Sequence, residues 1–183
     1  MKKEAFQKLK NFKDSVILAT VSAKSYEKTN IILVKYLTKD LGIPGVYVTL
    51  NKPFSAIKFF LSKSKINMDS LIFIDAITKT VGGNISKTKE CLFIGTPENL
   101  SDLSLAMDQA VTALPGKEKF LFFDSLNTLL IYNDAKTVAR FIHFLSGKMR
   151  VWKVRGIIIS LQKKGNEDLI NELTQFCDIG LEL

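Results

Sequence analysis

The sequence has few of the residues from which metal sites, disulfide frameworks and histidine-based catalysis are built. Its 183 residues include two cysteines, Cys91 and Cys177, which are far apart, and one histidine, His143. No cysteine pair has the spacing of a zinc site, and a mechanism that needs two histidines is excluded. We expect both cysteines to be small buried residues. We expect His143, in the apolar segment VARFIHFL, to be a core or groove residue rather than a catalyst.

Long apolar runs are missing as well. Stretches such as Val16–Ala19 and Gly156–Ile159 are far shorter than the roughly 18 residues that are needed to cross a bilayer. The lysine-rich start of the chain lacks the apolar core of a signal peptide. We therefore expect a cytoplasmic protein that does not bind to a membrane.

Arginine is scarce in a chain that is otherwise basic. The formal net charge is +8, yet only Arg140, Arg150 and Arg155 of the 26 basic residues are arginines. Recognition of phosphate or guanine favours the planar arginine side chain over lysine. The lysines are scattered, with no run longer than two, which is typical of a solvated surface. A nucleic-acid-associated basic domain is therefore an alternative that we do not favour.

What the sequence does contain is a regular alternation of apolar runs and helix-like segments. The apolar runs predict strands at 16–21, 46–50, 71–74, 91–95, 120–123 and 157–161, and an edge strand at 179–183. Apolar residues at helical spacing predict helices at 28–42, 53–64, 101–114, 134–150 and 167–178, after an amphipathic helix within 1–13. Strands that alternate with helices form βαβ crossovers. We therefore predict one α/β domain over residues 1–183, a three-layer α-β-α fold with a mainly parallel central sheet.

Ligands of such sheets bind beyond the carboxyl ends of the strands, so the residues that follow each strand are the candidates for a site. Asp75 ends one predicted strand, and we expect it to cap a helix or a loop rather than to act as a base. Ser160 and Gln162 lie at the end of another, and we expect them to be turn residues. Residues 78–90, TKTVGGNISKTKE, are polar and predict a mobile loop.

The stretch VSAKSYEKTN, residues 21–30, lies where a phosphate-binding loop would lie, between a buried strand and a helix. In the register of the pattern Gly-x-x-x-x-Gly-Lys-Ser/Thr, Ser22 and Glu27 take the glycine positions and are followed by Lys28 and Thr29. Glycine is needed there because the loop adopts positive φ values and its backbone N–H groups close around the phosphates. A glutamate at this point would also place a carboxylate beside the triphosphate. We therefore predict a decayed or repurposed phosphate loop.

The segment KFLFFDS has the form of a Walker B strand, whose aspartate helps to hold the magnesium ion of a bound nucleotide. If a nucleotide binds, Thr29 and Asp124 would be the magnesium ligands. The vestigial nucleotide site therefore comprises Ser22, Glu27, Lys28, Thr29, Asp124 and Ser125.

Taken in order, five segments give the chain a resemblance to the RecA-like P-loop ATPases of the KaiC type, especially their short, often archaeal, single-domain members. The segments are VILATVSAKSYEKTNIILVKYL, GVYVTLNKP, LIFIDAI, FLFFDSLNTLLIYND and RGIIISLQ. The most specific of them is FLFFDSLNTLL followed by a long helix. The resemblance implies a P-loop NTPase core with a degenerate Walker A motif. Lys28 and Thr29 then take the phosphate position and Asp124 the Walker B position.

The sequence departs from this family where activity would lie. Active relatives usually carry a pair of acidic residues after the second strand, one of which activates the attacking water. This chain has Asn51 and Lys52 there, in VTLNK, so a general base is missing. Relatives also tend to continue into a hairpin with a Lys-x-Arg element, whereas this chain stops at Leu183. The mechanism of a ring ATPase is therefore not expected.

We predict a non-hydrolysing regulatory or protein-interaction module with no catalytic residues and no bound cofactor. Its ligand would be a protein partner or a second copy of itself. One alternative is a weak ATP-binding protein, which takes ATP with Mg²⁺ or becomes an ATPase with a partner. The other alternative is the nucleic-acid-associated basic domain.

Overall fold

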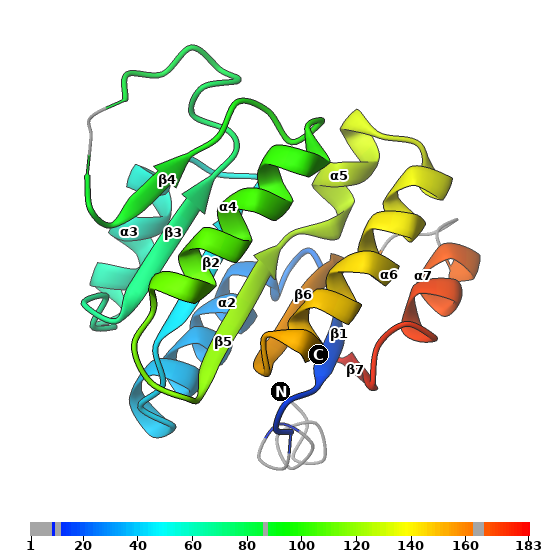
Figure 1. Cartoon of the computed structure of the whole chain (residues 1–183), viewed down its shortest axis with the longest axis horizontal. Coiled ribbons are helices and arrows are strands. Elements are labelled where there is room, and N and C mark those ends of the chain that lie inside the picture. Colours follow the sequence, from blue (N-terminus) through cyan, green and yellow to red (C-terminus); the bar gives the residue numbers. More distant parts are fainter. Residues whose placement is uncertain (1–8, 10–11, 86–87, 163–166) are drawn as a thin grey trace.

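The computed structural model describes residues 9, 12–85, 88–162 and 167–183. Among these residues a seven-stranded sheet forms the middle layer, in the order β4-β3-β2-β5-β6-β1-β7, and all neighbouring strands are parallel (Figure 1). The strands are β1 (Val16–Val21), β2 (Gly45–Thr49), β3 (Leu71–Asp75), β4 (Cys91–Phe93), β5 (Lys119–Asp124), β6 (Val154–Leu161) and β7 (Ile179–Glu182). The predicted parallel sheet is thus confirmed, including the edge strand at the carboxyl terminus.

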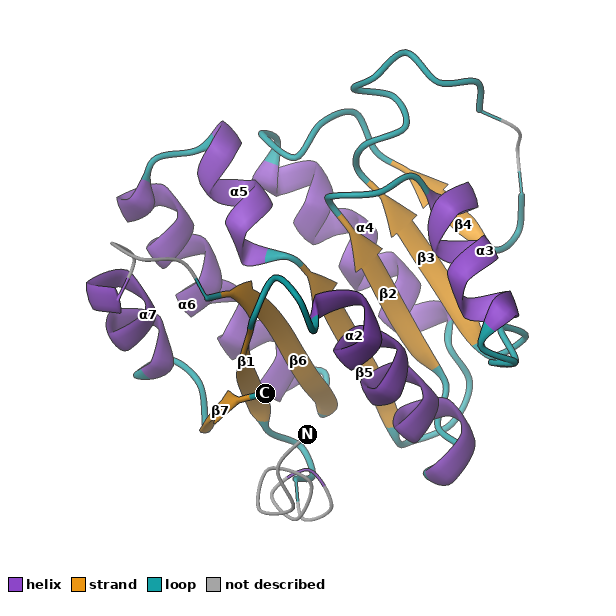
Figure 2. Ribbon diagram, turned by 180° about the vertical axis from the view of Figure 1, so that it is seen from behind, coloured by secondary structure: helices purple, strands orange, loops and turns teal. Residues whose placement is uncertain are grey.

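Helices cover both faces of the sheet. One face carries α2 (Tyr26–Lys35), the π-helical η1 (Tyr36–Asp40) and α3 (Phe54–Lys63), which lie nearest to the viewer in Figure 2. The other face carries α4 (Leu100–Ala113), α5 (Leu126–Tyr132), α6 (Ala135–Val151) and α7 (Glu167–Thr174). The predicted three-layer α-β-α arrangement is therefore also confirmed.

Alternate side chains of each strand enter different halves of the core. In β2, Val46 and Val48 join the apolar cluster with α4 and α6, whereas Tyr47 between them joins the cluster with α2 and α3. In β1, Leu18 likewise joins the cluster with α4 and α6, and Ile17 joins the cluster with α2 and α3. These side chains are all buried, because a parallel sheet with helices on both faces has no face in water.

Several helix boundaries differ from the prediction. The helix predicted at 28–42 begins earlier, at Tyr26, and its last turn is π-helical from Tyr36. The helix predicted at 167–178 ends at Thr174. Helix α5 was not predicted, because its seven residues LNTLLIY follow a buried strand and are too few to show a helical period against that apolar background.

The predictions for His143 and Cys177 were wrong, and a third prediction, the helix within 1–13, falls mostly outside the described residues. His143 is exposed on the outer side of α6, with its ring 4.9 Å from the ring of Phe176, so it does not belong to the core. Cys91 is buried as predicted, but Cys177 is only partly buried. Most of the helix predicted within 1–13 lies outside the described residues.

Candidate functional site

The carboxyl ends of four neighbouring strands lie close to the segments that the sequence singles out. β1 ends at Val21, β2 at Thr49, β5 at Asp124 and β6 at Leu161. In the sheet these strands are neighbours, in the order β2-β5-β6-β1. Since ligands of parallel sheets bind beyond the carboxyl ends of the strands, this end of the four strands is the candidate site.

Asp124 is a buried carboxylate that is held by two tyrosine hydroxyls. Tyr26, the first residue of α2, donates a hydrogen bond to Oδ1. Tyr47, in the middle of β2, donates a hydrogen bond of 2.6 Å to Oδ2. The Nδ2 group of Asn51 lies 3.4 Å from the Tyr26 hydroxyl and donates to it. Both oxygens of the carboxylate therefore accept hydrogen bonds from inside the protein.

Burial controls the protonation of these three groups. It raises the pKa of Asp124, because the carboxylate loses its hydration, and the hydroxyls of Tyr26 and Tyr47 oppose this effect only in part. Burial, followed by the charge of Asp124, raises the pKa of Tyr26 and of Tyr47 well above the usual tyrosine value. Both hydroxyls therefore keep their protons and act as donors to the carboxylate.

An ion pair closes the small space beside Asp124. The ammonium group of Lys52, just after β2, pairs with the carboxylate of Glu27 on α2 and lies 4.7 Å from the centre of the Phe60 ring. The cavity beneath measures about 30 Å³, which is room for roughly two water molecules. Small-molecule sites usually measure about 300–1,000 Å³. The space beside Asp124 is therefore much smaller than a usual small-molecule site.

The connection from β1 to α2 is a tight turn of four residues, Ser22–Ser25. The N–H group of Ser25 donates to the carbonyl of Ser22 at 3.1 Å, and the two hydroxyls are 2.8 Å apart. The N–H group of Thr29 donates to the carbonyl of Ser25 at 2.8 Å, as part of the first helical turn. A phosphate cradle needs a loop whose N–H groups point outward to the ligand, whereas the helix here uses the Thr29 group.

Two of the six predicted site residues lie together at the small cavity, and the other four lie elsewhere. Glu27 and Asp124 line the small cavity. Lys28 is exposed on α2, whereas Thr29 is buried in the same helix. Ser22 is part of the turn before α2.

Ser125 lies toward a different space from Asp124. It lines a second cavity of about 710 Å³ together with Asn51 and Gln162. Its side chain is 1% exposed, and among the described residues its Oγ atom has no hydrogen-bond partner. Ser125 therefore does not share the small cavity with Asp124.

Asp75 has the predicted capping role. Its carboxylate accepts hydrogen bonds from the N–H group of Phe54 at the start of α3, at 2.7 Å, and from those of Ile77 and Thr78, both at 2.8 Å. A carboxylate with several backbone donors fixes the ends of the elements around it. Ser160 is buried inside β6, whose end at Leu161 agrees with the predicted strand at 157–161, so the expectation that Ser160 is a turn residue was wrong.

Tyr26 and Tyr47 were not among the residues predicted for the site. A tyrosine in a strand that is buried on both faces, such as Tyr47 in GVYVTL, needs a hydrogen-bond partner for its hydroxyl. That requirement is a usable signal, because it points to a polar group at the end of a neighbouring strand. No comparable signal in the sequence points to Tyr26.

Two kinds of feature are missing among the described residues. No three His, Cys, Asp or Glu side chains of this part of the chain come together as they would around a metal ion. None of its helices is both long enough and apolar enough to pass through a bilayer.

Comparisons with known proteins agree with the fold described above. Residues 70–183 match the model of a family described as a family of unknown function, DUF7504. No curated protein sequence is significantly similar to the chain. The structure is similar to that of the KaiC-like protein PH0186 from the hyperthermophilic archaeon Pyrococcus horikoshii OT3, with a TM-score of 0.65 and 14% identity over 93% of this chain and 72% of that one.

A second solved structure is also similar, that of the uncharacterized protein PH0321 from Pyrococcus horikoshii in complex with an unknown peptide. Its TM-score is 0.67 at 15% identity, over 98% of this chain and 82% of that one. At such identities the likeness shows the fold alone. The KaiC/RecA-like fold that the sequence predicted is therefore confirmed.

Proposed function

The chain belongs to DUF7504, a family of unknown function, and from this premise and the KaiC-like fold we propose that it is a non-hydrolysing regulatory or protein-interaction module. In this proposal the nucleotide site of the fold is degenerate, because side chains of the protein itself fill it. The protein then acts by contact with a protein partner or with a second copy of itself.

The observation that carries the proposal is the pair of tyrosine hydroxyls on Asp124. The Walker B aspartate of a P-loop NTPase helps to hold Mg²⁺, which requires a near-octahedral set of oxygen ligands at about 2.0–2.1 Å. Here both carboxylate oxygens accept hydrogen bonds from Tyr26 and Tyr47, and about 30 Å³ of space remains beside them. The residues present do not fit a magnesium–nucleotide complex in this arrangement.

The residues after β2 support the absence of hydrolysis. A general base must be able to take a proton from the attacking water, and the amide of Asn51 is unable to do so. The ammonium group of Lys52 is engaged in an ion pair with Glu27. Neither residue replaces the acidic pair of the active relatives.

Contact with a protein is favoured over contact with a small ligand. The PH0321 protein, which shares the fold, has been observed in complex with an unknown peptide. This chain also exposes large apolar side chains, among them Phe59, Val81, Leu105 and Phe144. Exposed apolar surface of this kind is typical of protein-binding sites when the side chains are contiguous.

The proposal predicts that the isolated protein neither binds nor hydrolyses ATP. Calorimetric titration with ATP and Mg²⁺ should give no heat above that of dilution, and phosphate release should stay at background. The double variant Ser22→Gly with Glu27→Gly restores both glycines and removes a carboxylate, so it should bind ATP measurably better. Adding Lys28→Ala to that variant should abolish the gain in ATP affinity. Removing the repulsion between Glu27 and the phosphates helps only while Lys28 still attracts them.

The opposite result would support another function. Saturable heat with the wild-type protein, or phosphate release that disappears in Lys28→Ala, would identify a weak ATP-binding protein or an ATPase. Magnesium without ATP is the control for both measurements.

A further inference from the structure

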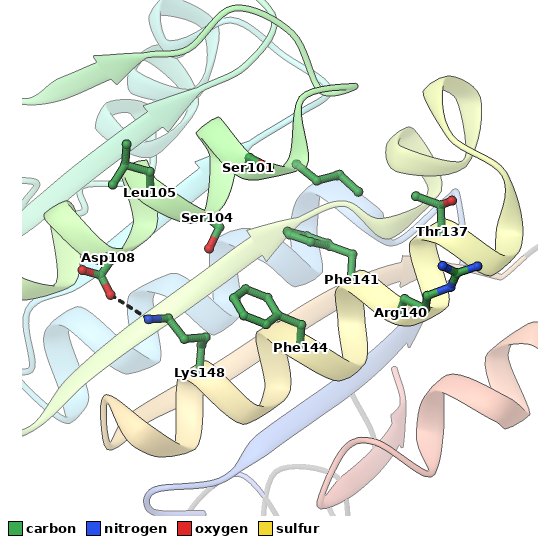
Figure 3. Close-up of a pocket in the computed structure, with 10 residues that line it drawn as sticks. Ser101, Ser104, Leu105, Asp108, Thr137, Arg140, Phe141, Phe144 and Lys148 are labelled. Atoms are coloured by element: carbon green, nitrogen blue, oxygen red, sulfur yellow. Dashed lines mark hydrogen bonds and ion pairs between the residues drawn. The ribbon is translucent and has the colours of Figure 1, made fainter.

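A groove runs between α4 and α6 on the outer side of the helices that cover the sheet (Figure 3). Its volume is about 670 Å³. Ser104 and Leu105 belong to the wall formed by α4, and Arg140, Phe141 and Phe144 belong to the wall formed by α6. The groove includes none of the residues around Asp124.

The groove is apolar where a surface helix is normally polar. Leu105 is 58% exposed and Phe144 is 50% exposed, although the outward faces of such helices usually carry polar side chains. Between them, Ser101 and Ser104 are small and leave the hollow open. Figure 3 shows the rings of Phe141 and Phe144 directed from α6 toward α4. Large and small side chains that alternate in this way form a surface into which the ridge of another helix fits.

The wall formed by α6 is also cationic. This helix has four basic residues and no acidic residue along its 17 positions. Two of them, Lys148 and Arg150, are ion-paired with aspartates of neighbouring elements. The other two, Lys136 and Arg140, are exposed and form no ion pair with any residue that the structure describes. The α6 side of the groove therefore carries, at Arg140, a positive charge that its own protein does not neutralise, whereas the α4 side carries Asp108, which is paired with Lys148.

We propose that this groove binds an amphipathic helix of a partner protein, whose apolar stripe is bordered by aspartate and glutamate on the side that faces α6. This inference rests on the proposed function as an interaction module, and it adds the surface and the class of partner. Apolar anchors at positions i, i+3, i+4 and i+7 let such a helix lie in a groove between two others. Thr137 and Lys148, at the two ends of the α6 wall, are eleven residues apart. They span about 16 Å, the length of about three helical turns.

A nucleic acid fits the groove less well than an acidic helix. Binding to a phosphate backbone depends on several cations that each neutralise one phosphate. Within the groove Arg140 is the one cationic side chain without an ion pair among the described residues, and Asp108 adds a carboxylate. The exposed apolar side chains of Leu105 and Phe144, which both line the groove, instead give a helix surface to bury.

The test measures binding of a synthetic helix to the full-length protein by fluorescence anisotropy. The labelled probe has about 18 residues, with leucines on one stripe and glutamates along one of its borders. A matched probe has lysine in place of every glutamate. The acidic probe should bind saturably, and the basic probe should bind at least about tenfold more weakly.

Variants of exposed residues locate the binding. Phe144→Ser and Arg140→Glu should each weaken binding of the acidic probe by about tenfold. Arg140→Glu should also reduce the ratio of the affinities for the acidic and the basic probe. Ile131→Ser, at a side chain that is 77% exposed and outside the groove, should change nothing. Equal thermal midpoints of the variants and the wild-type protein check that the fold is retained.

Four results would overturn the inference. The first is that the wild-type protein binds neither probe or both equally, and the second is that the groove variants bind as tightly as the wild type. If a DNA duplex competes with the acidic probe, and the Arg140→Glu variant no longer binds the duplex, the groove would be assigned to nucleic acid. Self-association that Phe144→Ser abolishes would assign it to a second copy of the chain. None of these measurements involves ATP, so they fail or succeed independently of the test for the proposed function.

Discussion

Asp124 combines burial with two hydrogen-bond donors, and its protonation should therefore affect the stability of the protein. Burial raises its pKa in the folded state above the value of about 3.9 expected in the unfolded chain. A raised pKa in an acid means that the folded state holds the proton more tightly than the unfolded state. The stability that this proton contributes is fully present below about pH 4 and is lost as the pH rises through the folded-state pKa.

Asp124→Asn should remove this dependence on pH. The amide keeps the shape of the side chain and still accepts a hydrogen bond from a tyrosine hydroxyl, but it does not ionise. The free energy of unfolding of the wild-type protein, relative to this variant, should fall as the pH rises from about 4. Urea unfolding of both proteins at several pH values measures the difference. If the difference in unfolding free energy between the two proteins does not depend on pH, the pKa of the Asp124 carboxyl is not raised in the folded state.

Tyr26→Phe should make the stability of the protein depend more strongly on pH. The variant removes one of the two donors that stabilise the carboxylate of Asp124, so the pKa of that carboxyl should rise further. The protein should be destabilised by about 1.5–3 kcal/mol at neutral pH, the usual contribution of a hydrogen bond to a charged group. The loss should be smaller at acidic pH, where the carboxyl is protonated. The same urea series tests this, and an equal loss at every pH would contradict it.

Gly45, the first residue of β2, is paired with Phe120 of β5. A Cβ atom at position 45 would be 2.3 Å from the ring of Phe120, which is completely buried. The ring has no free space into which to move, because it lies in the middle of the sheet under α2 and α3. This contact is a property of the strand pair, and it explains why glycine begins β2.

Gly45→Ala should therefore destabilise the protein by about 3 kcal/mol, as overpacked core substitutions do. Gly147→Ala is the matched control, because Gly147 lies in α6 and a Cβ atom there would meet nothing within 4 Å. The control should stabilise the helix by about 0.5–1 kcal/mol. Urea unfolding of the two variants measures both changes. A neutral Gly45→Ala variant would mean that β2 and β5 move apart easily.

The whole molecule carries a net charge of +8, and this charge should attract nucleic acid only weakly. The basic residues are mostly lysines, which lack the planar side chain that binds a phosphate through two parallel hydrogen bonds, and they are scattered along the sequence. A duplex that is retained at low salt should be released between about 50 and 200 mM salt, independently of its sequence. Retention on a heparin or DNA column measures this. Binding that persists at the higher salt or depends on sequence would favour the nucleic-acid-associated alternative.

The resemblance of five segments to the KaiC-type ATPases implied the KaiC-like fold. The pattern of the sequence determined the order of the strands along the chain and the presence of helices between them. This succeeded because a strand that is buried on both faces must be apolar along its length, and the helices between such strands must be amphipathic. It also brought Glu27 and Asp124 correctly to the same edge of the sheet, because residues that follow parallel strands meet there. It failed for α5, whose two turns are too short for a period to be recognised.

Only the tertiary structure decided what occupies the space around Asp124. Tyr26 and Tyr47 are 98 and 77 residues away from it in the sequence, and a hydrogen bond between such distant residues leaves no local pattern. The groove between α4 and α6 has the same origin. Leu105 and Phe144 are ordinary apolar residues of two amphipathic helices, and the sequence does not tell whether they enter the core or line the surface. That depends on how each helix is rotated against the sheet, which is decided by the packing of the whole core.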